Sequence, residues 1–139
     1  SEKRHFEGRK RRCKMTAISH ISDLIGRIAG DVRKENATGA AAIALSATAA
    51  EQARLVGLTL HLDAAPTTSE SLTITLDANA GAAYDTLLYS LDLSTGSTTD
   101  LLWLPDNDIF LETGDIIKVA YANTDTATYG AQLTLLEMS

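Results

Sequence analysis

The chain has 139 residues, of which 45% are hydrophobic and 22% charged, and its formal net charge is −6. This length predicts one domain that buries its own core, and Cys13, the only cysteine, excludes an intramolecular disulfide and a cysteine-based zinc site. No apolar run approaches the roughly 18 to 20 residues that cross a bilayer, and no signal-peptide core follows the polar N-terminus, so we expect a cytosolic origin without membrane insertion.

The charges divide sharply near residue 14. Residues 1–14 carry seven Lys and Arg against two Asp and Glu (+5), whereas residues 15–139 carry five against sixteen (−11). Because phosphate binding needs a positive surface, we do not expect the acidic body to bind nucleic acid. The basic arm alone has the charge to bind nucleic acid, an acidic surface or the acidic body of a neighbour, and the alternative is a solubilising tail.

The arm has a third interpretation, in which it is not native. The run from Arg11 to Met15 (Arg-Arg-Cys-Lys-Met) is what a bacterial ribosome-binding sequence followed by a start codon would encode. We therefore hypothesise that translation begins at Met15. An intact mass beginning at Met15 or Thr16 would support this, and a native peptide spanning Arg12 to Met15 would contradict it.

Residues 16–35 have apolar positions three and four apart, which predicts a short amphipathic helix that packs on its own body or on a neighbour. An extended arm is the alternative, because Gly26 and Gly30 each weaken a helix by about 1 kcal/mol relative to Ala. Residues 37–53 are interpreted as a linker that ends in a first strand, so that 15–53 form a helix and linker before a domain at 54–139. The candidate partner-binding residues are Ile18, Ile21, Ile25, Arg27, Ile28, Arg33 and Lys34.

From residue 54 onward the apolar residues recur with period two, which is typical of strands with one buried and one wet face. The alternation runs through residues 58–62, 72–76, 87–93, 117–121 and 131–135, with a more apolar stretch at 101–104. Turn-rich segments separate these runs. Six to eight short strands predict an all-β fold, an antiparallel β-sandwich or barrel. The outward positions are rich in Thr and Ser, which either suits packing against a partner or reflects the strand preference of Thr.

Motifs for catalysis and cofactor binding are missing from the sequence. His5, His20 and His61 are isolated, and there is no nucleophile elbow and no glycine-rich phosphate loop, so we expect no enzyme activity and no cofactor. Asp106-Asn107-Asp108, with Glu112 close behind, could offer oxygens to calcium, but the glycine-turned loop of such sites is missing and an ordinary turn is favoured.

Four segments carry a resemblance to a known family. They are Leu55–Leu62 (LVGLTLHL), Ser71–Asp77 (SLTITLD), Ala83–Leu88 (AYDTLL) and Leu111–Asn123 (LETGDIIKVAYAN), in which Gly114-Asp115 makes a tight turn into a strand. In their order they resemble the small jelly-roll cement, or decoration, proteins of tailed-bacteriophage capsids. The basic arm and the predicted helix depart from that pattern.

The resemblance implies a non-enzymatic virion protein, made in the host cytoplasm, that binds the outside of the shell and bridges major capsid protein subunits as a homodimer or homotrimer. An alternative is a carbohydrate- or receptor-binding sandwich of a phage fibre or spike, which requires exposed aromatic side chains. We expect Trp103, flanked by leucines, in the core instead. A hydrolytic sandwich is a third class, and it requires two convergent carboxylates.

Overall fold

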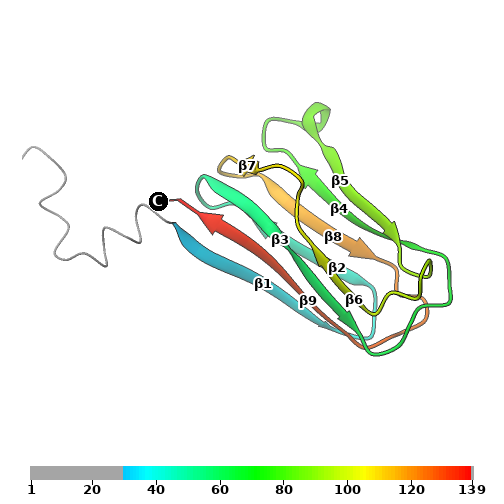
Figure 1. The fold of residues 1–139 in the computed structure, drawn as a ribbon. Helices are drawn as coiled ribbons and strands as arrows, with labels where there is room; N and C mark the ends of the chain where they lie inside the picture. Colours follow the sequence, from blue (N-terminus) through cyan, green and yellow to red (C-terminus); the bar gives the residue numbers. More distant parts are fainter. Residues whose placement is uncertain (1–29, 139) are drawn as a thin grey trace, which may run out of the picture.

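The protein is described here by a computed structural model of residues 30–138, in which two β-sheets pack face to face (Figure 1). The strands of this region are β1 (Asp31–Gly39), β2 (Ile43–Thr48), β3 (Ala53–Leu62), β4 (Ser71–Asp77), β5 (Thr86–Asp92), β6 (Asp100–Trp103), β7 (Ile109–Leu111), β8 (Ile116–Tyr121) and β9 (Tyr129–Glu137). A 3₁₀ helix, η2 (Ala82–Tyr84), lies in the connection between β4 and β5. The predicted all-β antiparallel sandwich is confirmed.

The strands pair as one long antiparallel hairpin folded over on itself. β1 pairs with β9, β2 with β8, β4 with β5, and β3 with both β6 and β7. One sheet therefore has the order β1-β9-β3-β6, with β7 also on β3, and the other has the order β2-β8-β4-β5. We call them the β1 sheet and the β2 sheet. This nesting of Greek keys in two sheets is the jelly-roll arrangement.

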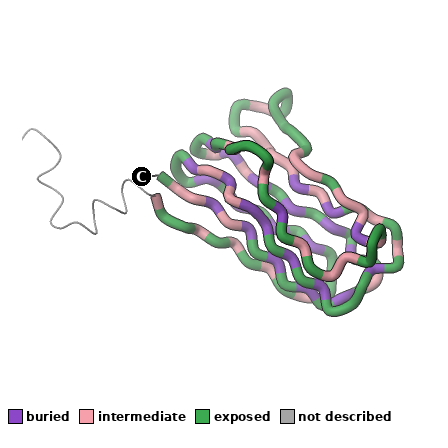
Figure 2. The backbone as a smooth tube through the Cα atoms, viewed as in Figure 1, coloured by how far each residue is buried: buried purple, intermediate pink, exposed green. Residues whose placement is uncertain are grey.

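The core lies between the two sheets and follows from the alternation of the sequence (Figure 2). In β3, Leu58 and Leu60 are buried while Thr59 and His61 are exposed. The same period holds in β8 and β9, whose buried members include Ile117, Val119, Tyr121, Ala131, Leu133 and Leu135. Because successive side chains of a strand point to opposite faces, these strands each give one row to the core.

The sandwich begins at Asp31, well before the boundary predicted at residue 54. The predicted helix is wrong for residues 31–35, because β1 pairs along its whole length with β9, from Asp31 opposite Glu137 to Gly39 opposite Tyr129. The segment 37–53, predicted as a linker that ends in a first strand, instead contains the end of β1 and the whole of β2. Residues 16–29, the rest of the predicted helix, lie outside the described residues.

One strand departs from simple alternation because of a bulge. The register between β4 and β5 shifts after Ile74, which pairs with Tyr89, so that Thr75 pairs with Leu87 and Leu88 is the extra residue. A bulge changes which face the following side chains occupy. Leu87, predicted to face the core, is therefore 58% exposed, while Leu88 packs against the core.

Candidate docking face

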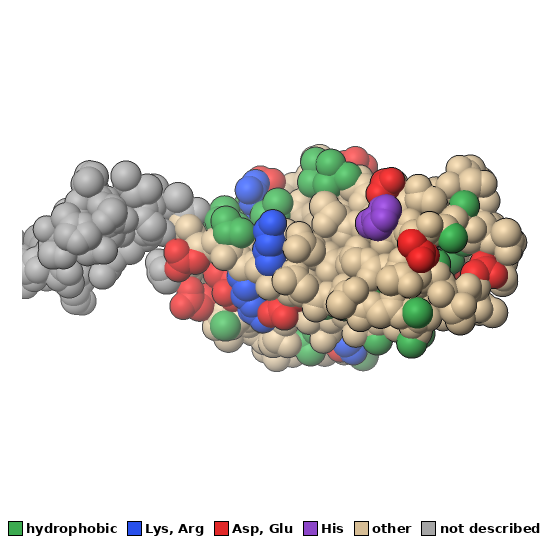
Figure 3. Space-filling model, turned by 90° about the horizontal axis from the view of Figure 1, so that it is seen from below, with side chains coloured by type: hydrophobic (Ala, Val, Ile, Leu, Met, Phe, Trp, Pro, Cys, Tyr) green, Lys and Arg blue, Asp and Glu red, His purple; other side chains and the backbone are tan. Residues whose placement is uncertain are grey.

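The outward surface of the β1 sheet is broad and has few charged side chains. Register places four cross-strand rows on it: Val32, Leu136, Arg54 and Phe110; Lys34, Thr134 and Gly57; Asn36, Gln132, Thr59 and Leu102; and Thr38, Gly130, His61 and Asp100. We call this surface the outer face. Figure 3 looks onto it: the purple histidine beside a red carboxylate lies over a largely tan expanse, with blue, red and green side chains toward the left.

Large apolar side chains stand exposed on this face. Leu102 and Phe110 are each 67% exposed, Leu104 is 56% exposed, and Val32 at the opposite edge is 67% exposed. Leu102 points outward because its neighbour Trp103 points into the core, opposite Leu58. Interface cores are enriched in such residues and depleted of Lys, Glu and Asp, so this composition favours contact with another protein.

Leu104 lies across the face because β3 has a glycine beneath it. A Cβ added at Gly57 would meet the Cδ2 of Leu104 at 2.8 Å and the carbonyl oxygen of Trp103 at 2.5 Å. A side chain at position 57 would therefore push the β6–β7 segment away from β3. Gly57 thus allows the edge of the sheet that carries Leu102 and Leu104 to lie close to its neighbour.

A hydrogen-bonded pair of side chains and a shallow hollow mark the end of the face where β3 ends beside the start of β6. The Nδ1 of His61 lies 2.6 Å from the Oδ1 of Asp100 directly across the strand pair, and both side chains are well exposed. The hydrogen bond with His61 lowers the pKa of Asp100 below its usual value. A hollow of about 410 Å³ opens beside the pair, where Gly130 contributes no side chain. Open and wide, it offers no enclosed site for catalysis.

Two of the predicted partner-binding residues lie on β1, with different roles. The guanidinium of Arg33 points to the inner side and pairs with Glu35 at 2.8 Å and Glu137 at 3.2 Å, and it donates to the carbonyl oxygen of Thr48. These contacts, the hydrogen bond with Glu35 first, raise the pKa of Arg33. Arg33 therefore ties the two sheets together, and 29% of its side chain stays exposed, so its role toward a partner remains a prediction. Lys34 is exposed on the outer face.

The other five predicted partner-binding residues cannot be placed by the structure. They are Ile18, Ile21, Ile25, Arg27 and Ile28, and all lie outside residues 30–138.

The loop considered for calcium has a different partner. The Oδ1 of Asp108 accepts a hydrogen bond from Arg54 at 3.3 Å, on the outer face of β3. Within the described part of the chain, no three His, Cys, Asp or Glu side chains group closely enough to hold a metal ion. Over the same residues, no helix is long and apolar enough to cross a membrane.

Trp103 lies in the core, as predicted, with 9% of its surface exposed. Its ring stacks on Tyr89 of the opposite sheet, with centroids 5.6 Å apart and planes 30° apart. This pair closes the sandwich where β5 and β6 face each other. Trp103 is therefore not a platform on which a sugar could stack.

Sequence reasoning did not find the apolar members of the outer face. The run Leu101-Leu102-Trp103-Leu104 breaks the alternation of apolar and polar residues, so that one of its two faces must be apolar and wet. That break was the available signal. The run Ile109-Phe110-Leu111 breaks the alternation in the same way, whereas Val32 gave no such signal, because its position opposite Leu136 depends on long-range register.

Comparison of the chain with family models, with curated proteins and with solved structures gives no significant match. The function is therefore argued from the residues of this chain and the geometry of its outer face.

Proposed function

We propose that this protein is a non-enzymatic capsid cement protein, which binds the outside of a tailed-phage shell and reinforces it by bridging major capsid protein subunits. The observation that carries the proposal is the exposure of Leu102, Leu104 and Phe110 together on one face of the jelly roll. The sequence resemblance described above supplies the identity of the partner.

The size of the outer face agrees with such a role. Four strands about 4.8 Å apart, of which the three longest have nine or ten residues at about 3.3 Å each, give a surface of roughly 19 by 30 Å, or about 570 Å². A standard interface takes about 800 Å² from each partner. The outer face would supply most of that area, and the adjoining β6–β7 segment with Leu104 and Pro105 the rest.

The composition of the face also keeps the cost of binding low. Its uncharged polar members are Asn36, Thr38, Thr59, Gln132 and Thr134, whereas Lys34, Arg54, His61 and Asp100 lie in the rows toward its two ends. Short side chains lose little rotamer entropy when a partner covers them, and uncharged ones lose less hydration than Lys or Glu. A partner would therefore gain apolar contact at Leu102 and Leu104 without having to desolvate many charges.

The carbohydrate-binding alternative has weaker support, because the tryptophan on which it depended is in the core. The outer face also presents aliphatic groups more than aromatic ones. We therefore keep the protein-binding proposal as the one that the geometry favours.

The test is whether the protein occurs on particles in its native source. Particles purified by density gradient should contain the protein in a fixed ratio to the major capsid protein, and removing it should lower the temperature at which the particles release DNA. Protein that sediments alone, with particles unaffected, would overturn the proposal.

A further inference from the structure

Gly130, on the outer face, is a glycine that the fold itself does not require. It lies near the start of β9, between β1 and β3, where it pairs with Thr38 on one side and with His61 on the other. Glycine weakens a paired strand, because it loses more backbone entropy than other residues and offers no side chain to pack. A glycine at this position therefore needs an explanation.

The two usual structural reasons for a glycine do not apply to Gly130. Five of the seven glycines in residues 30–138 have a positive φ, and Gly57 lies against the backbone of Trp103. Gly130 does not have a positive φ, and a Cβ added to it would meet nothing within 4 Å. The described chain would therefore accept a side chain at position 130. The remaining reason is the close approach of another molecule from outside, which a strand glycine permits.

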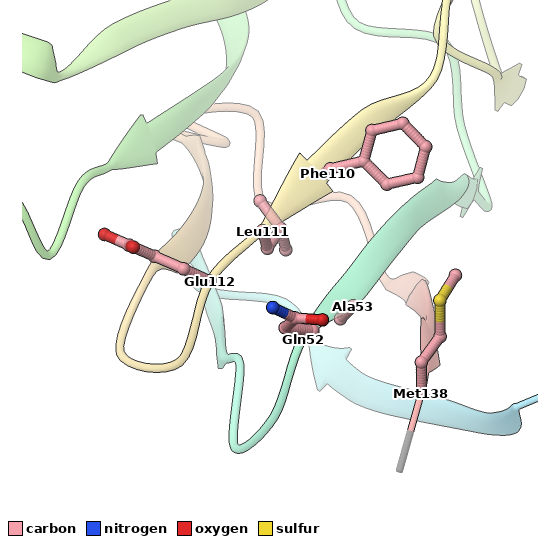
Figure 4. A pocket seen from close by; sticks show the side chains of 6 residues that line it. All are labelled: Gln52, Ala53, Phe110, Leu111, Glu112 and Met138. Carbon is pink, nitrogen blue, oxygen red and sulfur yellow. The ribbon is translucent and has the colours of Figure 1, made fainter. Parts of the chain in front are cut away.

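The missing side chain leaves a hollow in the surface of the paired strands, which we call the Gly130 hollow. It measures about 410 Å³ and is lined by Gly130 with residues 59–61 of β3 and 100–102 of β6. The hollow of about 360 Å³ beside Phe110 and Met138 is different, because it opens where β7 and β9 end (Figure 4). A gap at strand ends needs no special cause, whereas the Gly130 hollow depends on one residue type.

The Gly130 hollow offers both an apolar contact and a carboxylate. Leu102 is 67% exposed. The Oδ1 of Asp100 accepts a hydrogen bond from the Nδ1 of His61 at 2.6 Å (Figure 3). Within residues 30–138, the Oδ2 of Asp100 accepts only from the Oγ1 of Thr99, at 3.4 Å, and 74% of the Asp100 side chain is exposed. One carboxylate oxygen is thus available to a partner.

We propose that the Gly130 hollow receives a long basic side chain of the capsid partner, a Lys or Arg, whose stem packs on Leu102 and whose charged head binds Asp100. This inference rests on the proposed function and names the partner's chemistry at one point of the outer face.

Charge and spacing favour a basic side chain over other occupants. The two rows at this end of the outer face contain one carboxylate, that of Asp100, and no Lys or Arg. Leu102 and Asp100 lie two residues apart on β6, or about 7 Å along the strand. Lys and Arg join an apolar stem to a cationic head over such a distance. An apolar side chain would instead cover the Asp100 carboxylate without pairing it, which is unfavourable.

Filling the hollow tests the proposal. Gly130→Val places a branched side chain there, which the strand should accept without a fall in the urea midpoint. Its affinity for particles stripped of the protein should nonetheless fall at least about tenfold, because the partner's side chain is obstructed. Ala120→Val, the matched control, adds bulk at an exposed position of β8 in the other sheet and should bind like the parent.

Parental affinity of Gly130→Val would overturn the proposal. A large loss of stability in this variant would also overturn it, because the glycine would then serve the fold.

The charge is tested separately. Asp100→Asn keeps an acceptor for His61 but removes the carboxylate, so it should lower the affinity about three- to tenfold at low salt. The difference should shrink at high salt, because salt screens the attraction. Glu51→Gln, in the exposed turn between β2 and β3, loses the same charge and should bind like the parent. Equal affinities of Asp100→Asn and Glu51→Gln would overturn the basic occupant.

These outcomes can be separated from a failure of the proposed function. If the parent does not bind stripped particles, the capsid proposal falls and this inference falls with it. If the parent binds and Leu102→Glu does not, while Gly130→Val binds like the parent, only the inference about the Gly130 hollow falls.

Discussion

Gly57 lies so close to Trp103 that a methyl group on Gly57 would come within 2.5 Å of the carbonyl oxygen of Trp103. The contact is with backbone, which cannot move aside as the end of a flexible side chain can. The edge segment that presents Leu102 and Leu104 can therefore lie against β3 only because residue 57 has no side chain.

Gly57→Ala should destabilise the fold by about 1 to 3 kcal/mol, the usual cost of overpacking. Gly130→Ala is the matched control, because Gly130 also lies on the outer face and a Cβ there meets nothing within 4 Å. Urea denaturation of both variants checks this. Equal stability of the two variants would contradict the role given to Gly57.

Arg33→Met should lower the free energy of unfolding by about 1 to 2 kcal/mol, because it breaks hydrogen bonds to two carboxylates and a carbonyl group. Lys34→Met, one residue along the same strand and exposed, should change stability by less than about 0.5 kcal/mol. Thermal unfolding of the two variants separates them. If Arg33 serves a partner instead of the fold, the two substitutions will have similar effects on stability.

Stability should fall in acid through carboxylates that accept hydrogen bonds in the loops. Asp125 accepts from the amides of Thr67 and Thr68, and the backbone amide of Thr68 is the first cause of its lowered pKa. A carboxylate whose pKa is lower in the folded state than its ordinary value of 3.8 stabilises the fold at any pH above 3.8. The contribution is lost as the pH falls through the folded pKa.

Asp125→Asn should therefore flatten the decline of the urea midpoint below pH 3.8. Asp106→Asn, at an exposed loop position, controls for the loss of one negative charge. If the urea midpoint of the Asp125→Asn protein falls with pH as steeply as that of the parent, the hydrogen bonds of Asp125 with Thr67 and Thr68 do not drive acid unfolding.

The sequence predicted the central strands well because their signal is local. Leu58, Leu60 and Leu62 alternate with polar residues, and the same alternation identifies β4, β8 and β9. Each of these strands lies inside its sheet with one face in the core, which is the environment that the period-two pattern encodes. The sandwich class followed from these strands alone.

The edges of the fold were harder to predict because they depend on distant partners. Val32 falls four residues after Ile28 and so matched a helical stripe, yet its conformation is set by Leu136, which pairs with it across the ladder. The exposure of Leu87 likewise depends on a bulge opposite Ile74. No pattern within ten residues of either position records these pairings, so the outer face could not be assembled from sequence. The partner-binding residues proposed at 18–28 remain a prediction.

The central claim, that the outer face binds the capsid, is tested most directly by two matched substitutions. Leu102→Glu and Leu87→Glu each place a carboxylate at an exposed leucine, 67% and 58% exposed, on the β1 and β2 sheets respectively. Each purified variant is added to particles stripped of the protein, and its occupancy is measured against the parent. We predict that Leu102→Glu loses at least about 90% of occupancy, which corresponds to a penalty of about 1.4 kcal/mol or more at limiting concentration, while Leu87→Glu binds like the parent. Full occupancy by Leu102→Glu, or equal loss by both variants, would contradict the claim.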